Sequence, residues 1–317
     1  MPVPLPYVHE LRRLPGGRRL RTRFAPSVTG RLHLGHLVNA VYVWGIARAI
    51  DAEVALRLED HDRGRFRPEY ETAILDDLDW LGLTPDLGAT AEFRAGASPW
   101  RQSDRATRYA AALAELRSKG LTYACECSRS ALAHAGEQND GEEERRYPGT
   151  CRDKGLPEAA GRRIRVRIEP GIERFDDVRL GPQEQDPSAQ CGDLVARDVQ
   201  GDWTYQFAVA VDDLDQDITL VIRGLDLLGS TGRQLRLARL LGRRDPSRYL
   251  HHPLVTDGAG RKLSKRDFAR SLADHRAEGR TAESLLGEAA YLGGLLPEAR
   301  PVPVKDLPEL FADIATS

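Results

Sequence analysis

Two histidines stand where the sequence predicts the start of a helix. The stretch RFAPSVTGRLHLGHL contains His33, Gly35 and His36, and the apolar run LVNAVYVWGIARAI follows it. The N–H groups at a helix N-terminus lack intrahelical partners and favour an anionic ligand such as phosphate. Gly35 lets a nucleotide approach the backbone, and histidines three apart lie on one side of the first turn. These residues are therefore a candidate phosphate site, unless both histidines only cap or hydrate the helix end.

A second candidate lies in the stretch GAGRKLSKRDF, residues 258–268. Its glycines predict a flexible loop, and Lys262, Ser264 and Lys265 offer cationic and hydroxyl donors to a charged transition state. Only five of the 46 basic residues are lysines, so two of them in one loop favour a role for a compact ammonium group. The alternative is an ordinary basic surface loop.

Three of the four cysteines lie close together in the sequence, as Cys125, Cys127 and Cys151. Thiolates at this spacing beside a turn-rich loop suit a structural Zn²⁺, which takes four ligands. For the fourth ligand, His134 is the commoner residue type, whereas Tyr147 would be unusual. The alternative is a set of free cysteines.

Hydrophobic periodicity predicts strands that alternate with helices. The expected strands cover 20–25, 52–60, 162–169 and 217–224, and the expected helices cover 36–50, 67–83, 103–120 and 230–242. Ser103 is the expected N-cap of the third helix, and a hairpin is expected to turn near residues 200–201. This order predicts an α/β fold with a parallel sheet and right-handed crossovers, interrupted by a metal-binding insertion within 121–192.

The composition excludes several classes of protein. A net charge of −2 lacks the basic bias of a protein that coats nucleic acid. No apolar stretch approaches the ~18 residues of a membrane span, and the N-terminus lacks the apolar core of a signal peptide, so a cytoplasmic location is expected. The four cysteines do not indicate a disulfide framework in a chain of this size.

Together these stretches resemble the class I aminoacyl-tRNA synthetases, in their glutamate-specific branch. RFAPSVTGRLHLGHL is similar to the first signature of that family and KLSKR to the second. The segments RLED, YQFAVAVDD and VIRGLDLLGSTGRQ also match, in the family's order, between about residues 21 and 268. The resemblance implies a Rossmann-like catalytic domain that forms an aminoacyl-adenylate from ATP and L-glutamate, with Mg²⁺ bound to the ATP.

The resemblance also implies roles for individual residues. The implied glutamate-binding residues are Arg23, Phe24, Ala25, Pro26, Ser27, Glu59, Tyr205 and Arg223. The implied ATP-binding residues are His33, Gly35, His36, Lys262, Ser264 and Lys265, of which His33, His36 and Lys265 are catalytic. The implied zinc ligands are Cys125, Cys127, Tyr147 and Cys151. The simplest alternative for Glu59 is a surface ion pair with Arg57.

Chain length within the family suggests the acceptor. Only 52 residues follow Lys265, too few for an anticodon-binding region, which implies the short branch that attaches glutamate to the queuosine base of tRNA(Asp). The expected division is a mobile extension over 1–20, a first catalytic half over 21–120, a zinc-binding insertion over 121–192 and a second catalytic half over 193–250. The second signature loop and a short helical buttress would occupy 251–317, in a monomer.

Two other functions are compatible with these motifs. One is the catalytic core of a glutamyl-tRNA synthetase, which would esterify a tRNA 3′ end. The other is a regulator that kept the fold and lost the chemistry, although such a protein has no need of both phosphate-binding signatures.

Overall fold

The computed structural model describes residues 11, 19–128, 146–255 and 270–311 of the chain. The predicted loop 258–268, with Lys262, Ser264 and Lys265, lies outside the described residues, as does His134. Among the residues that are described, no helix combines the length and the apolar character needed to cross a membrane.

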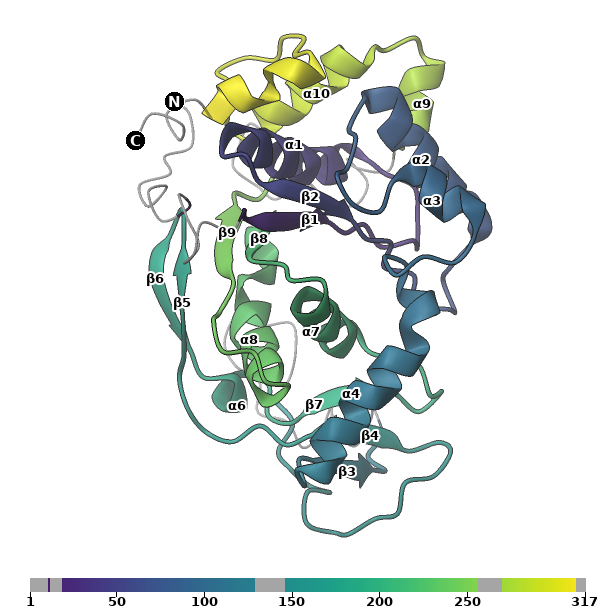
Figure 1. Cartoon of the computed structure of the whole chain (residues 1–317), viewed down its shortest axis with the longest axis vertical. Helices are drawn as coiled ribbons and strands as arrows, with labels where there is room; N and C mark the ends of the chain where they lie inside the picture. Colours follow the sequence, from purple (N-terminus) through teal and green to yellow (C-terminus); the bar gives the residue numbers. More distant parts are fainter. Residues whose placement is uncertain (1–10, 12–18, 129–145, 256–269, 312–317) are drawn as a thin grey trace.

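The predicted parallel sheet is present. Strands β1 (Arg21–Phe24) and β2 (Glu53–Leu56) pair in parallel, as do β8 (Leu220–Gly224) and β9 (Arg248–His252). The Thr219 N–H donates to the Arg21 carbonyl oxygen at 3.0 Å, which places the start of β8 beside β1. Strands β1 and β8, which lie about two hundred residues apart in the sequence, are therefore neighbours in space (Figure 1).

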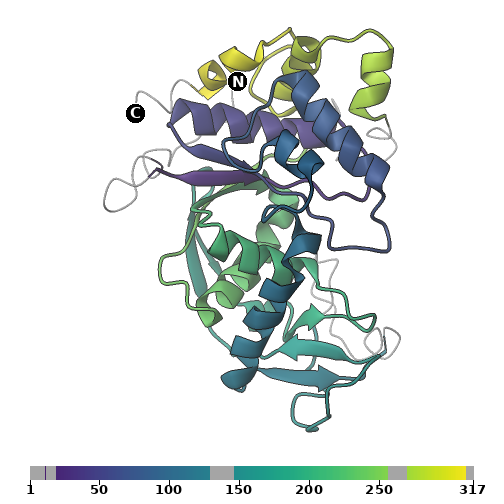
Figure 2. The ribbon, with the colours of Figure 1, turned by 45° about the vertical axis from the view of Figure 1, so that its right-hand side comes forward.

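Helices cover the face of β1 and β2. Helix α1 (Leu34–Ala49) begins two residues before the expected start and is buried along most of its length. Helix α10 (Ala282–Leu292) and the 3₁₀-helix η5 (Val304–Phe311) pack against α1, and α9 (Leu272–Ala277) lies beside α2 (Pro68–Leu81) (Figure 2). Glycine at position 82, with φ 71°, ends α2 as its pattern predicts. The short helix α3 (Thr90–Ala95) follows α2.

The third expected helix begins differently from the prediction. A 3₁₀ turn, η3 (Gln102–Arg105), precedes α4 (Ala106–Ser118), and Arg105 occupies the N-cap position. The prediction that Ser103 caps this helix is therefore wrong. Ser103 lies inside the 3₁₀ turn, where its backbone N–H donates to the Asp60 carboxylate at 2.7 Å.

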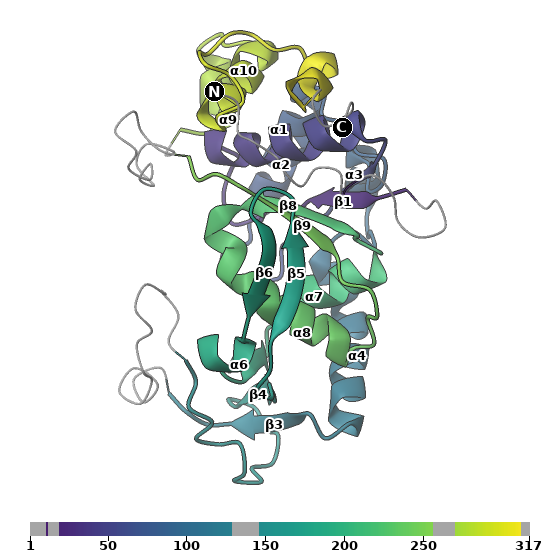
Figure 3. The ribbon, with the colours of Figure 1, turned by 90° about the vertical axis from the view of Figure 1, so that its left-hand side faces the viewer.

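The segment between the two halves of the parallel sheet forms antiparallel pairs. Strand β4 (Arg163–Val166) lies between β3 (Thr122–Cys125) and β7 (Leu194–Arg197). Strands β5 (Glu173–Asp177) and β6 (Gly181–Gln185) pair with each other, and β5 joins β9 through Asp177 and Tyr249, so they extend the sheet of β8 (Figure 3). The short helix α6 (Pro187–Gln190) returns the chain to β7.

The hairpin expected near 200–201 is short. One antiparallel bridge joins Arg197 and Trp203, and the chain then enters α7 (Tyr205–Asp215). After β8, the 3₁₀-helix η4 (Leu225–Ser230) leads into α8 (Thr231–Leu240). This places the N-terminal ends of α1 and α7 near the carboxyl ends of the parallel strands, where α/β sheets bind ligands.

Candidate active site

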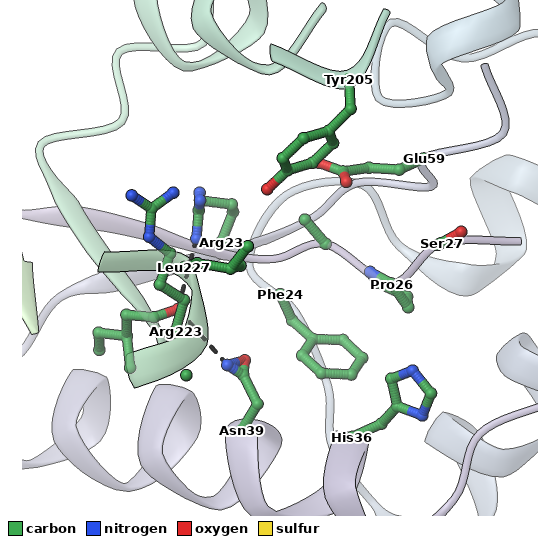
Figure 4. A pocket seen from close by; sticks show the side chains of 13 residues that line it. Arg23, Phe24, Pro26, Ser27, His36, Asn39, Glu59, Tyr205, Arg223 and Leu227 are labelled. Atoms are coloured by element: carbon green, nitrogen blue, oxygen red, sulfur yellow. Dashed lines mark hydrogen bonds between the residues drawn. The ribbon is translucent and has the colours of Figure 1, made fainter. Parts of the chain in front are cut away.

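A cavity of about 290 Å³ opens at the carboxyl ends of β1 and β8 (Figure 4). All eight residues predicted to bind glutamate line it, as does His36. The lining consists of Arg23, Phe24, Ala25, Pro26, Ser27, His36, Asn39, Glu59, Tyr205, Ile222, Arg223, Gly224 and Leu227.

Backbone pairing places Glu59 at the cavity. The segments that follow β1 and β2 remain paired. The Glu59 N–H donates to the Pro26 carbonyl oxygen at 3.0 Å, and the Val28 N–H donates to the Glu59 carbonyl oxygen at 3.2 Å. Proline at position 26 has no N–H to donate, so the regular ladder of hydrogen bonds is interrupted at this residue. The backbone of Glu59 is nevertheless held opposite Ser27 by a parallel bridge.

A buried ion network holds the Glu59 carboxylate. Arg57 is fully buried and donates to Glu59 at 3.0 Å and to Asp213 of α7 at 2.7 Å. The surface ion pair considered for Arg57 and Glu59 is therefore wrong, since both side chains lie in the interior. Buried charges need partners of opposite sign, and Arg57 has a third within ion-pair distance, Asp212 at 3.9 Å.

Arg23 belongs to the same network. Its Nε donates to Asp213 at 3.2 Å, and its guanidinium also donates to the Ile222 carbonyl oxygen at 3.4 Å. Burial alone would raise the pKa of Asp213, but the guanidiniums of Arg23 and Arg57 lower it to about 2. Asp213 therefore remains a carboxylate and orients Arg23 toward the cavity.

Arg223, at the end of β8, is buried among neutral groups. Its guanidinium donates to His251 Nε2 at 3.1 Å, to Gln234 Oε1 at 2.7 Å and to Thr231 Oγ1 at 2.7 Å. No ion pair joins it to a carboxylate in the described part of the chain, and burial lowers its pKa. A buried cation without a counter-charge is costly, so this side of the cavity favours an anionic ligand.

The two sides of the cavity differ in charge. Figure 4 shows the Arg23 and Arg223 guanidiniums on one side, with the Glu59 carboxylate and the Tyr205 ring across from them. Tyr205 is the first residue of α7 and is partly buried, and burial raises its pKa. Its hydroxyl is therefore a neutral hydrogen-bonding group beside the carboxylate.

The two signature histidines cap α1. The Gly35 N–H donates to His33 Nδ1 at 3.1 Å, and the His33 N–H donates to His36 Nδ1 at 3.2 Å. Burial lowers the pKa of both rings, that of His36 to about 3, so both are neutral. Because each Nδ1 accepts a hydrogen bond, the ring proton of each lies on Nε2. Capping uses Nδ1 of each ring, so it does not by itself exclude phosphate binding through Nε2.

The chain that follows the second signature returns to these histidines. Ser271 forms an antiparallel bridge with His33, and the Leu272 N–H donates to the Leu32 carbonyl oxygen at 2.9 Å. The residue that begins α9 thus lies directly beside the N-terminus of α1.

Four cavity residues were not among those predicted: Asn39, Ile222, Gly224 and Leu227. Asn39 had a detectable signal, because it follows His36 by three residues and so shares its helix face. Arg57 and Asp213 lie behind the cavity and support its lining residues. They belong to the segments RLED and YQFAVAVDD that resemble the family, but nothing in the local sequence indicates that the two residues contact each other.

The predicted metal ligands form a buried cluster. The Sγ atoms of Cys125, Cys127 and Cys151 all lie within 4.8 Å of one another, and none of these cysteines forms a disulfide. The Tyr147 hydroxyl lies 3.5 Å from Cys125 Sγ and 3.9 Å from Cys127 Sγ. Three thiols and a hydroxyl around one point are a donor set that could hold a metal ion.

Comparisons with known proteins identify the family of the chain. A family model described as "tRNA synthetases class I (E and Q), catalytic domain" matches residues 19–299. The chain is 40% identical to the glutamyl-Q tRNA(Asp) synthetase of Nitratidesulfovibrio vulgaris over 90% of each chain. It is 46% identical to that of Bordetella bronchiseptica, over 79% of this chain and 76% of the relative.

A solved structure is also similar. The glutamate-tRNA synthetase from Elizabethkingia anophelis matches 92% of this chain with a TM-score of 0.75 and 26% sequence identity. The chain spans 65% of the length of that protein.

Proposed function

The chain belongs to the class I tRNA synthetases (E and Q), in the branch of the glutamyl-Q tRNA(Asp) synthetases, and we propose that it activates L-glutamate with ATP and transfers it to queuosine in tRNA(Asp). The observation that carries this proposal is the cavity, whose charges complement those of glutamate.

The charge balance supports glutamate as the amino acid. Of the charged side chains that line the cavity, Arg23 and Arg223 are positive and Glu59 is negative, a net charge of +1. Free glutamate carries two carboxylates and one ammonium, a net charge of −1, and so neutralises the set. In this proposal Arg223 binds the side-chain carboxylate of glutamate, because its guanidinium meets only neutral groups, and Glu59 binds the α-ammonium.

The ATP site lies at the N-terminus of α1. The Nε2–H groups of His33 and His36 donate to phosphate oxygens, and Gly35 lets the nucleotide approach the backbone. The resemblance assigns Lys262, Ser264 and Lys265 of the second signature to the ATP phosphates, and we propose that role for them. The pairing of Ser271 with His33 supports this arrangement, since it brings the chain after that loop to the histidines. Mg²⁺ bound with ATP supplies further neutralisation of phosphate charge.

The first reaction needs no protein nucleophile. A glutamate α-carboxylate oxygen attacks the α-phosphorus of ATP, the bond to the bridging oxygen breaks, and pyrophosphate leaves. The enzyme contributes positioning by Arg23, Glu59 and Arg223, and it stabilises developing negative charge with histidine and lysine donors. In the second reaction a hydroxyl of the queuosine cyclopentenediol attacks the glutamyl carbonyl carbon, which forms an ester and releases AMP.

Cys125, Cys127, Cys151 and Tyr147 are the proposed ligands of a structural Zn²⁺. Three sulfur donors and one oxygen donor satisfy the four-coordinate preference of zinc, and the buried cluster joins β3 to the segment that leads back to the sheet. The zinc-binding segment faces the tRNA in this proposal, and the active centre is built by other elements.

Glutamate-dependent exchange of pyrophosphate into ATP tests the proposed activation step. We expect exchange with L-glutamate and at least ~100-fold weaker exchange with L-glutamine, because the amide leaves the charge of Arg223 unpaired. Equal exchange with glutamine would contradict the assigned carboxylate site. No exchange with any amino acid would favour a non-catalytic regulator.

A further inference from the structure

A pair of buried residues stands behind Arg223 and lines no part of the cavity. We propose that Asp177 and His251 are positioning residues, which hold the Arg223 guanidinium in place and keep its charge available to the substrate carboxylate. The inference rests on the proposed role of Arg223 in binding glutamate.

Asp177, at the end of β5, fixes the His251 ring. Both side chains are completely buried, and His251 Nδ1 lies 2.7 Å from Asp177 Oδ2. The other carboxylate oxygen accepts the backbone N–H groups of Arg179 at 3.0 Å and Leu180 at 2.8 Å. A carboxylate held in this way accepts the Nδ1 proton, which leaves Nε2 of His251 without one.

His251 Nε2 therefore accepts hydrogen bonds on the side of Arg223. The Arg223 Nε–H donates to it at 3.1 Å. The Thr231 hydroxyl lies 3.2 Å from the same nitrogen and accepts from Arg223 Nη2 at 2.7 Å, so its own proton points to His251. Arg223, Thr231 and His251 thus form a closed triangle of hydrogen bonds in which each proton has a definite place.

The neutral ring between Asp177 and Arg223 preserves the charge of the site. A carboxylate in direct contact with the guanidinium would neutralise it and weaken binding of the substrate. His251 passes on the orienting effect of Asp177 without forming that ion pair. Of the five N–H groups of Arg223, three are bound by His251, Gln234 and Thr231, which leaves two for a carboxylate.

Two substitutions at one position separate positioning from packing. A glutamine side chain can place an acceptor where Nε2 stands, whereas an asparagine side chain reaches only as far as Nδ1. We expect His251→Asn to raise the KM for glutamate by ~10-fold or more in the exchange assay, with the KM for ATP within twofold of wild type. We expect His251→Gln to recover the KM for glutamate to within about threefold of wild type.

Thr231→Val is a second test that keeps the side-chain shape. It removes one acceptor of Arg223 and one donor to His251, so the KM for glutamate should rise several-fold while that for ATP stays unchanged. A wild-type KM for glutamate in His251→Asn or Thr231→Val, or equal loss in the Asn and Gln variants, would overturn the positioning role. Exchange catalysed by the wild-type protein with glutamate in the same assay would support the proposed function independently of the variants. No exchange by the wild-type protein would overturn both the proposed function and the positioning role.

Discussion

Two of the buried arginines at the site, Arg57 and Arg223, differ in their partners, and this difference predicts opposite effects of the same substitution. Arg57 neutralises two buried carboxylates, Glu59 and Asp213. Arg57→Met leaves both without their closest cation, and breaking a buried pair in this way costs about 3–5 kcal/mol. For a chain of this size that corresponds to a fall in melting temperature of roughly 4–8 °C.

Arg223→Met removes a cation that faces only neutral groups. The loss of three hydrogen bonds destabilises the fold, but removal of an uncompensated buried charge offsets much of this, so the melting temperature should stay within roughly 3 °C of wild type. Binding of glutamate should suffer instead. Loss of a charge-assisted contact of about 3 kcal/mol raises the KM for glutamate by roughly 150-fold.

Thermal unfolding and exchange kinetics of the two variants test this together. Arg57→Met is the matched control, because it makes the same chemical change directly after β2, another strand of the parallel pairs. The reasoning is refuted if Arg223→Met unfolds as early as Arg57→Met, or if it keeps a wild-type KM for glutamate.

Three further predictions concern other parts of the molecule. Burial raises the pKa of Asp77 from 3.8 to about 6, although Arg276 and Arg31 act in the opposite direction. The folded state therefore binds this proton more tightly than the unfolded state, and the stability of the fold decreases as pH rises from about 4 to about 6. Asp77→Asn should therefore stabilise the protein by up to about 3 kcal/mol at pH 8 and have little effect at pH 3, and the same gain at both would contradict the assignment. Cys125→Ser should lose bound zinc by metal analysis and impair transfer to tRNA more than glutamate activation; equal impairment would show that the cluster supports the active centre directly. Lys265→Ala should abolish exchange and leave the melting temperature unchanged, whereas full activity would remove Lys265 from the catalytic set.

The sequence was sufficient for the main strands and helices around the cavity and for nine of its thirteen lining residues. The strand before Pro26, the helix after His33 and the buried strand ending at Arg223 carry strong local patterns, and all are present. The family motifs then predicted which side chains share the cavity. The fourth ligand of the predicted zinc site remained undecided from the residues alone, since residue type favoured His134 over Tyr147.

The supporting charges could not be found in this way. Asp213 lies in a helix where an acidic residue normally faces solvent, and its partner Arg57 is 156 residues away. Asp177 and His251 are likewise 74 residues apart, and no local pattern links them. Such contacts depend on how the strands pair in three dimensions. The N-cap at Ser103 failed for the same reason, because Asp60 binds its backbone from a distant loop.

The identity of the group that accepts glutamate is the part of the proposed function that a single measurement tests most directly. We would incubate the protein with labelled glutamate, ATP and tRNA(Asp) with or without queuosine, digest the product with nuclease, and locate the ester. We expect label on the queuosine nucleoside of the anticodon and no transfer to tRNA that lacks queuosine. Label on the 3′ terminal adenosine would contradict it and identify a tRNA-charging enzyme.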